Sequence, residues 1–232
     1  MVLPFFYIAR YDGVQKQIVL DEDTSRHVIQ VLRMKTGEMI NLTDGKGNLL
    51  TCEIIEENKK HCAVSVKEAR HQAQRTRRVS VAISLLKNTN RFEWFLEKAT
   101  EIGVAEIIPL ICTRTEKEKF RFDRLNGICI SAMLQSQQVW LPVLHEPIDF
   151  DKATGQPADQ KFIAHCIEGT RAELSDRSIN DSTFICIGPE GDFTTEEIQL
   201  ALQNNFVPVS LGETRLRTET AGVVAATLLV NA

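Results

Sequence analysis

Two glycine-containing segments hold the residues whose types and spacing could do chemistry. The first, 187–191, reads IGPEG and follows an apolar run, and the second, 211–221, reads LGETRLRTETA. Glycine lets a backbone approach a ligand closely and present its N–H groups. Ligands of open α/β sheets bind outside the carboxyl ends of the strands, where loops of this kind lie. A plain turn between a strand and a helix is the alternative for the first segment, and the pattern alone leaves both open.

The two arginines of the second segment, Arg215 and Arg217, need partners. They could pair within the segment with Glu213 and Glu219, or they could bind an anionic or strongly polar ligand group. Neither segment is a Walker A loop or a G-x-G-x-x-G fingerprint, which argues against kinases and nicotinamide dehydrogenases. The sequence also has no G-x-S-x-G elbow and no H-E-x-x-H pair, so no hydrolase nucleophile or zinc site is evident. We expect a site without a metal ion.

Strands and helices alternate around these segments. A helix is expected after Thr194, which forms a capping-box pattern with Glu197. The last segment, 221–230, is apolar on every side, so this helix must be buried in a core or against a second subunit. Buried strands separated by helices predict an α/β domain with a mostly parallel sheet. The other helices are expected near 92–102 and 125–136, and the strands at 79–86, 106–112, 161–167, 184–187 and 207–211.

The first 70 residues instead predict short strands with tight turns, which is typical of a small β-barrel. A hairpin is expected at 44–47, DGKG. One helix after the acidic residues 21–23 would bury Val28, Val31 and Leu32. We expect a barrel domain over 1–70, a basic linker over 71–78 and the α/β domain over 79–232. The barrel strands are expected near the N-terminus and at 17–20, 38–42, 48–55 and 61–66.

Charge is distributed unevenly along a chain whose net charge is −4. Between residues 59 and 91 there are nine basic residues and one acid, whereas 142–213 holds thirteen acids and four bases. A phosphate backbone would be attracted to the first segment and repelled by the second. A solvated linker face explains the basic run equally well, and charge alone does not decide between the two.

The remaining composition fits a cytoplasmic globular protein. Apolar residues make up 43% and charged residues 25% of the chain, and no run approaches the length of a membrane span. The apolar start lacks a basic region before it, so we interpret it as a strand and not as a signal peptide. Six cysteines without a C-x-x-C pair are expected to be buried, reduced thiols. His165 and Cys166 are not expected to share a metal ion, because successive strand residues point to opposite faces.

Several motifs in the family's order give the sequence a specific resemblance. The segment 27–33, HVIQVLR, resembles H-x-x-x-V-L-R; 87–104 resembles K-x-x-x-R-x-E-x-x-x-x-K-x-x-E-L-G-V; Gln135 and Ser136 with 141–142 resemble Q-S…P; and the two glycine segments match cofactor-loop signatures. Together they resemble the RsmE family of 16S rRNA uridine-N3 methyltransferases, in the knotted SPOUT superfamily. Asp192 replaces a glycine that is usual in the family, and Gln137 and Gln138 replace the usual Gly and Arg.

The resemblance implies a PUA-like barrel followed by a SPOUT trefoil-knot domain, working as a homodimer on 16S rRNA or the small ribosomal subunit. S-adenosylmethionine would bind in three loops, 165–169, 188–191 and 211–217. The cofactor-binding candidates are His165, Ile187, Gly188, Pro189, Glu190, Gly191, Leu211, Gly212, Leu216, Arg217 and Thr218. The RNA-binding candidates are His27, Arg33, Arg75, Arg77, Arg78, Gln135 and Ser136.

The chemistry that this implies is removal of the weakly acidic N3 proton of uridine and alignment of N3 with the methyl group. Arg91 and Arg217 are candidates for stabilising negative charge on the uracil oxygens. In one form of this hypothesis, Arg91 comes from the partner subunit. Glu190 is a candidate base, or its carboxylate accepts backbone N–H bonds in its own loop. The base must leave any pairing that hides N3. The alternatives are the same fold acting on another RNA such as tRNA, and a non-enzymatic RNA-binding protein of ribosome assembly.

Overall fold

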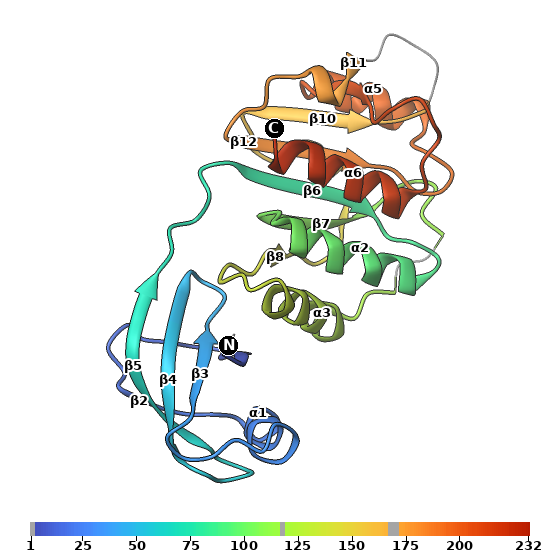
Figure 1. The fold of residues 1–232 in the computed structure, drawn as a ribbon. Coiled ribbons are helices and arrows are strands. Elements are labelled where there is room, and N and C mark those ends of the chain that lie inside the picture. Colours follow the sequence, from blue (N-terminus) through green and yellow to red (C-terminus); the bar gives the residue numbers. More distant parts are fainter. Residues whose placement is uncertain (1–2, 117–118, 167–171) are drawn as a thin grey trace. The chain divides into compact units, whose positions relative to one another are not determined.

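The computed structural model describes residues 3–116, 119–166 and 172–232, and divides the chain into two compact units. The first unit comprises residues 1–74 together with 133–141, and the second comprises 75–132 and 142–232. Figure 1 shows the elements of each unit. The segment 133–141 belongs to the first unit although its first three residues end a helix that begins in the second. The linear division predicted from sequence does not contain this excursion.

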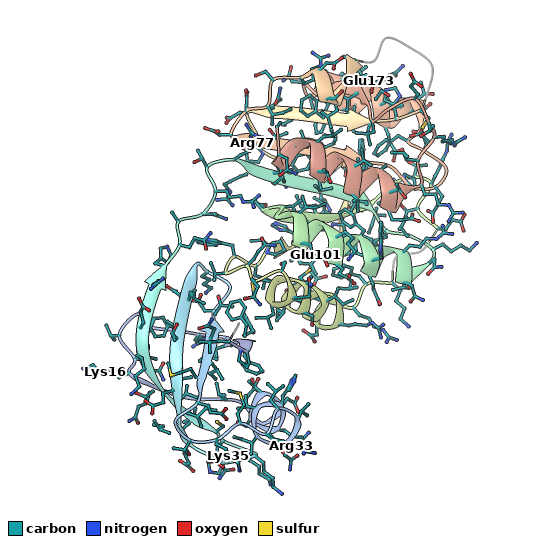
Figure 2. The ribbon with its side chains drawn as sticks, viewed as in Figure 1. Lys16, Arg33, Lys35, Arg77, Glu101 and Glu173 are labelled. Atoms are coloured by element: carbon teal, nitrogen blue, oxygen red, sulfur yellow. The ribbon has the colours of Figure 1, made fainter. Side chains whose placement is uncertain are left out.

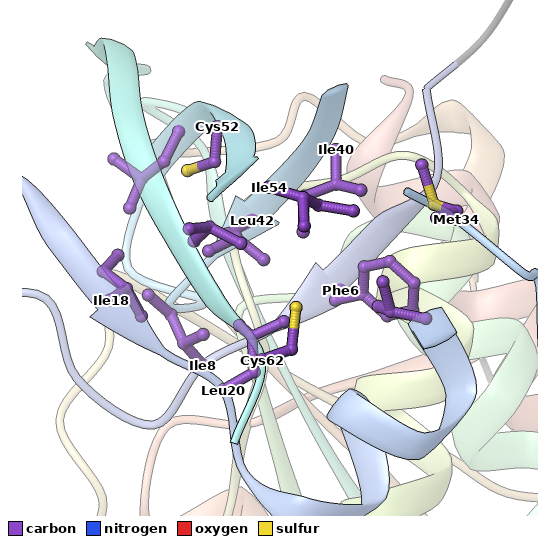
Figure 3. Packing of buried hydrophobic residues seen from close by; sticks show 13 residues of the cluster. Phe6, Ile8, Ile18, Leu20, Met34, Ile40, Leu42, Cys52, Ile54 and Cys62 are labelled. Atoms are coloured by element: carbon purple, nitrogen blue, oxygen red, sulfur yellow. The ribbon is translucent and has the colours of Figure 1, made fainter. Parts of the chain in front are cut away.

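The first unit is built on a five-stranded sheet with the order β1-β3-β4-β5-β2. β1 and β3 are parallel and the other pairs are antiparallel. Every strand places apolar side chains in one core (Figure 3), as in a small barrel. The strands are β1 (Phe5–Tyr7), β2 (Gln17–Val19), β3 (Met39–Thr43), β4 (Asn48–Glu56) and β5 (Ala63–His71).

The predicted helix after the acidic residues is a short α-helix continued by a π-turn. Asp21 caps α1 (Glu22–Arg26) by accepting the N–H of Thr24 at 2.7 Å, and the π-turn η1 covers His27–Val31. Of the three side chains expected to be buried, only Val28 is; Val31 is 66% and Leu32 42% exposed. The prediction was wrong because a π-turn does not keep the 3.6-residue period that would align these positions on one face.

The segment 133–141 is fixed to the hairpin between β3 and β4. Lys46 pairs with Trp140 in an isolated antiparallel bridge. Gly47 has φ +91°, and a Cβ there would lie 2.6 Å from the Trp140 ring and 2.7 Å from the carbonyl oxygen of Gln72. This close approach, together with the left-handed backbone, requires glycine. The turn glycines thus serve a packing contact as well as the hairpin.

The basic linker is shorter than predicted. β5 continues to His71 and the next strand begins at Arg78, so only 72–77 lack strand structure. The side chains of β5 from Lys67 onward are all exposed. A strand end without a buried face has no alternation of apolar and polar residues. The end of β5 could therefore not be predicted from the sequence.

The second unit has a parallel sheet of eight strands, seven in the order β11-β13-β10-β12-β6-β7-β8, with β9 also paired to β7. The predicted mostly parallel sheet is confirmed. The strands are β6 (Arg78–Ser84), β7 (Glu106–Ile111), β8 (Val143–Leu144), β9 (Ile148–Asp149), β10 (Gln160–Ala164), β11 (Ala172–Glu173), β12 (Ser182–Ile187) and β13 (Val207–Ser210). The predicted strand 161–167 ends earlier, at Ala164, and its residue 167 lies outside the described residues.

Helices cover both faces of this sheet. α2 (Thr89–Ile102) and α6 (Thr218–Val230) pack together over β6, with α3 (Phe122–Gln135) beside α2 in Figure 1. α4 (Phe150–Thr154) and α5 (Thr195–Gln203) pack with Ala82, Phe184 and Phe206 in a core on the sheet. The predicted capping box of α5 is confirmed by reciprocal bonds between Thr194 and Glu197 at 2.8 and 3.2 Å. A short 3₁₀ turn, η2 (Leu174–Asp176), completes the unit. Among the described residues, no helix is both long and apolar enough to span a membrane.

Candidate functional site

A cavity of about 410 Å³ lies where three neighbouring strands of the second unit end. β13, β10 and β12 are adjacent and parallel, and the residues that follow each of them line the cavity. Figure 1 shows these loops on one side of the sheet. The volume lies in the range of pockets for small organic ligands. The cavity is therefore located where an open parallel sheet is expected to bind its ligand.

The loops predicted to bind a cofactor converge on this cavity. Part of the first predicted loop, residues 167–169, lies outside the described residues. Gly191 does not line the cavity but follows residues that do. The candidates that line it are His165, Ile187, Gly188, Pro189, Glu190, Leu211, Gly212, Leu216, Arg217 and Thr218. Cys166, Thr214 and Arg215 also line it and lie within the predicted loops, although they were not named as single candidates. The lining residues outside the predicted loops and candidates include Ala164, Asp192, Val209, Ser210 and Ala221.

Asp192 ties two of these loops together. Its backbone has φ 64°, and its carboxylate accepts the N–H of Cys166 and that of Phe193, each at 2.8 Å. Aspartate is among the few non-glycine residues that adopt this left-handed conformation. Asp192 does not cap the following helix, because the cap of α5 is Thr194. Replacing the usual glycine instead adds a bridge from the loop after β12 to the end of β10.

Arg114 is a second fastening of the loop after β12 that sequence reasoning missed. Its guanidinium donates to the carbonyl oxygen of Gly191 at 2.6 Å and to that of Phe193 at 3.5 Å. Its side chain also packs closely against Gly191. A lone arginine in the loop after β7 gave no sequence signal for this role. With Asp192, it holds the loop backbone in place before a ligand arrives.

Arg91, in the first turn of α2, lines the cavity and forms an ion pair with Glu219. Its Nε lies 3.6 Å from Oε1 of Glu219, whose side chain is only 9% exposed. The other carboxylate oxygen of Glu219 is buried without a hydrogen-bond partner. The alternative in which Glu213 and Glu219 neutralise the two arginines of the last loop is not what the structure shows. Among the described residues, Arg215 and Arg217 form no ion pair, and both line the cavity.

A second, more open depression adjoins the cavity. It is lined by Arg91 and Glu190, which also line the cavity, and by residues 87–90. Glu190 is exposed, and no hydrogen bond to its carboxylate from the described part of its own loop is present. The three catalytic candidates are thus brought together at this one site: Arg91 and Glu190 at the border of the two hollows, and Arg217 on the cavity wall.

Five of the six cysteines are buried, as predicted, and Cys166 is the exception. Burial raises the pKa of Cys52 and Cys112 to about 12 and that of Cys129 to about 11. Cys166 and His165 both line the cavity. The alternation expected of strand residues does not apply to them, because β10 ends at Ala164. The described residues hold no cluster of His, Cys, Asp and Glu suited to a metal ion.

Thiol alkylation is expected to modify Cys166 alone in the native protein, because alkylation needs an accessible thiolate. A ligand that fills the cavity should slow this reaction. Intact-mass measurement after brief treatment with iodoacetamide, with and without S-adenosylmethionine, tests both points. Cys166→Ala is the control and should remain unlabelled until the protein is denatured. Rapid labelling of two or more thiols in the folded protein would contradict the burial described above.

The RNA-binding candidates lie on both units. In the first unit, His27 begins η1 and Arg33 lies two residues beyond its end, and both are exposed. Figure 2 shows Arg33 and Lys35 beside α1. Gln135 ends α3, and Ser136 follows it and donates to the carbonyl oxygen of Met133 at 3.2 Å. The arginines of the second unit have partners there: Arg75 bonds to Ile102, Arg77 to Ala232 and Arg78 to Glu106.

The fold and the site define a class: an α/β domain with a ligand cavity at the carboxyl ends of its parallel strands, joined to a small five-stranded domain. Residues 72–230 match the family model of the RNA methyltransferase domain, and 20–67 match that of the RNA methyltransferase PUA domain. The chain belongs to the RNA methyltransferase family. The expected PUA-like domain, followed by an α/β methyltransferase domain with a mostly parallel sheet, is confirmed.

Known relatives resemble the chain over nearly its whole length. It is 38% identical to a probable rRNA methyltransferase from Porphyromonas gingivalis, with a TM-score of 0.91 and 99% of each chain covered. A ribosomal RNA small subunit methyltransferase E from Neisseria gonorrhoeae, solved with S-adenosylmethionine bound, is 28% identical, with a TM-score of 0.87 and coverage of 97% and 95%. The protein of the same name from Rickettsia conorii is 27% identical over 224 residues, which cover 94% of this chain and 91% of that protein.

Proposed function

We propose that the protein transfers a methyl group from S-adenosylmethionine to N3 of a uridine in 16S rRNA of the small ribosomal subunit. The observation that carries this proposal is the convergence of the loops after β10, β12 and β13 on one cavity, with Arg91 and Glu190 at its open border. Family membership supports the reaction class. The names of the relatives support the rRNA substrate. Such a substrate places the protein in the cytoplasm.

The cavity fits S-adenosylmethionine, the donor bound in the Neisseria structure. Its volume of about 410 Å³ suits a ligand of that size. Backbone groups of the loops at 188–190 and 211–216 are available to read the adenine edge. The unpaired guanidinium groups of Arg215 and Arg217 suit the carboxylate of the methionyl part. When bound, this cofactor supplies an electrophilic methyl group on a sulfonium sulfur.

The residues at the border of the cavity then act on the nucleoside. Uridine N3 becomes nucleophilic only as its proton leaves, which puts negative charge on the uracil oxygens. Arg91, oriented by Glu219, provides a positioned cation for that charge, and Arg217 is a second. Glu190, exposed at the same border, is placed to accept the proton. Uridine must be unpaired or extruded to present N3 to these groups.

A homodimer is part of this proposal. One side of α6 packs against α2, β6 and β12, and Gly222 is buried there. The other side is only partly covered and carries Val223, Val224 and Leu228. An apolar helix face of this kind is suited to a second subunit. The RNA contacts that we propose are Arg75, Arg77 and Arg78 in the second unit and His27, Arg33, Gln135 and Ser136 in the first.

The assay that tests the proposal uses purified protein, S-adenosylmethionine and unmodified 16S rRNA. We expect one 3-methyluridine per transcript, located by nuclease mapping and mass spectrometry. Unmodified tRNA is the matched alternative substrate. Methylation of tRNA and not of 16S rRNA would favour the same fold acting on another RNA. Failure to bind S-adenosylmethionine in calorimetry would favour the non-enzymatic RNA-binding alternative.

A further inference from the structure

A second hollow in the α/β unit has the chemistry of an anion site. It has a volume of about 270 Å³ and lies at the first turns of two helices, α2 and α3. Three cations line it, Lys119, Arg121 and Arg124, whereas Glu93 is the one lining acid among the described residues. The remaining lining residues are Thr89, Asn90 and Leu125. Three positive charges against one negative charge leave the hollow with a net charge of +2.

One of the three cations, Arg124, forms an ion pair with Glu93, but this pair does not remove the net positive charge of the hollow. Nε and Nη2 of Arg124 donate to the two oxygens of Glu93 at 2.8 and 3.0 Å. Glu93 is thereby fully engaged, since its side chain is only 16% exposed and both oxygens contact one guanidinium. The pair fixes the plane of the Arg124 guanidinium. Its Nη1 donates to no acceptor among the described residues. A planar guanidinium whose one edge is fixed by a carboxylate can bind a phosphate with its other edge.

The other two cations are not neutralised by any residue that the structure describes. Lys119 and Arg121 are exposed, and neither forms an ion pair within the described part of the chain. Arg121 directly precedes α3, and Thr89 and Asn90 belong to the first turn of α2. The dipoles of both helix N-termini add to the attraction for an anion. Side-chain charge and backbone therefore favour the same kind of ligand.

The hollow is also continuous with the catalytic site. Thr89 and Asn90 line both this hollow and the open depression at residues 87–91, and Arg91 and Glu190 line both that depression and the cofactor cavity. The three hollows are therefore neighbours within the α/β unit. A polyanion with its reacting base at Arg91 would have a neighbouring phosphate within reach of the three cations.

We propose that the hollow of Lys119, Arg121 and Arg124 binds a backbone phosphate of the RNA strand that carries the target nucleotide. This inference rests on the proposed function and adds a substrate-positioning site to it. The phosphate contact fixes the strand beside the cofactor cavity and so aligns the target base with Arg91 and Glu190. It contributes affinity and alignment, and it carries no sequence information by itself.

The test is the double variant K119Q/R121Q, which removes two charges and keeps the side-chain stems. Its matched control is R177Q, which removes an exposed arginine that follows η2 at the opposite edge of the sheet, near β11. Affinity for unmodified 16S rRNA is measured over a range of salt concentrations, with KM for rRNA, kcat and the affinity for S-adenosylmethionine. The melting temperature verifies that each variant is folded.

We expect the slope of log affinity against log salt to fall by about one to two units in K119Q/R121Q, because each lost phosphate contact removes about 0.7 to 0.9. KM for rRNA should rise, whereas the affinity for S-adenosylmethionine should not change, since neither residue lines the cofactor cavity. R177Q should match the unsubstituted protein in all four measurements.

Three results would overturn the assignment. An unchanged slope and KM in a folded double variant, while the unsubstituted protein methylates rRNA, would refute the phosphate site and leave the proposed function intact. Binding of inorganic phosphate that the double variant abolishes, with RNA affinity unchanged, would assign the hollow to a free phosphate. A protein that binds S-adenosylmethionine but neither binds nor methylates rRNA would refute the proposed function, and this site with it.

Discussion

Replacing Arg91 with alanine is expected to lower kcat for rRNA methylation by about 100- to 1,000-fold, the usual effect of removing one positioned group that stabilises developing charge. The arginine is well prepared for this role. It projects from the first turn of α2 and borders both the cofactor cavity and the adjoining depression. The nearly buried carboxylate of Glu219 holds it at 3.6 Å. A cation fixed in this way needs no reorganisation as the uracil oxygens gain charge.

Two further variants separate charge from position. Arg91→Lys keeps the charge but loses the planar fork, so its kcat should lie between those of the unsubstituted protein and Arg91→Ala. Glu219→Gln removes the group that orients Arg91, so it should lower kcat while the KM for rRNA stays near its original value. Single-turnover rates at saturating S-adenosylmethionine measure all three. An Arg91→Ala protein that binds the cofactor and retains near-original kcat would eliminate Arg91 from the chemistry.

The second unit could be predicted well from sequence because its elements are periodic or capped. The continuous apolar runs at 79–86 and 106–112 are typical of strands buried on both faces, and the structure places β6 and β7 there. The capping box at Thr194 located the start of α5. The order of the strands could not be predicted in this way, because periodicity contains no information on which strands become neighbours or how the chain threads between them. A knotted topology is implied only by the resemblance to a family and stays a prediction.

In the first unit the prediction failed where local geometry departs from regular helix or strand. The π-turn at His27–Val31 exposes Val31 and Leu32, and Arg33 adopts φ 58°, after which Met34 is buried again. The return of the segment 133–141 to the hairpin of β3 and β4 is a long-range contact without a local signature. Both features depend on tertiary packing, which overrides the local period.

The loops that form the site could be predicted from the sequence, but the contacts between these loops could not. The glycine segments identified the walls of the cavity, since glycines and arginines after buried strands are visible in the sequence. The bridge from Asp192 to Cys166, the two carbonyl bonds of Arg114 and the pairing of Arg91 with Glu219 join segments between 26 and 128 residues apart. Spacing along the chain cannot reveal such contacts. The hollow of Lys119, Arg121 and Arg124 was missed for the same reason, because α2 contributes three of its seven lining residues.

A charge on the uncovered side of α6 is expected to abolish the homodimer that we propose. Val224 and Leu228 are partly exposed, while Gly222 is buried against Phe95 and Ile83. Val224→Asp therefore adds no charge to the core of the protomer. In a symmetric dimer, however, it buries two unpaired carboxylates, and an uncompensated buried charge costs about 3–5 kcal/mol. A cost of that size weakens association by more than about a hundredfold.

Sedimentation velocity and calorimetry measure the result. The unsubstituted protein should sediment at twice its chain mass of 26.2 kDa, and Val224→Asp should be a folded monomer of 26.2 kDa with weak affinity for S-adenosylmethionine. Gly222→Val is the matched core variant. A Cβ there would lie 2.6 Å from the ring of Phe95, so this protein should lose stability and aggregate. If the unsubstituted protein is itself a monomer at micromolar concentration, the dimer and a catalytic site shared between subunits are both refuted. If Val224→Asp aggregates as Gly222→Val does, its side of α6 belongs to the core of the protomer and not to an interface.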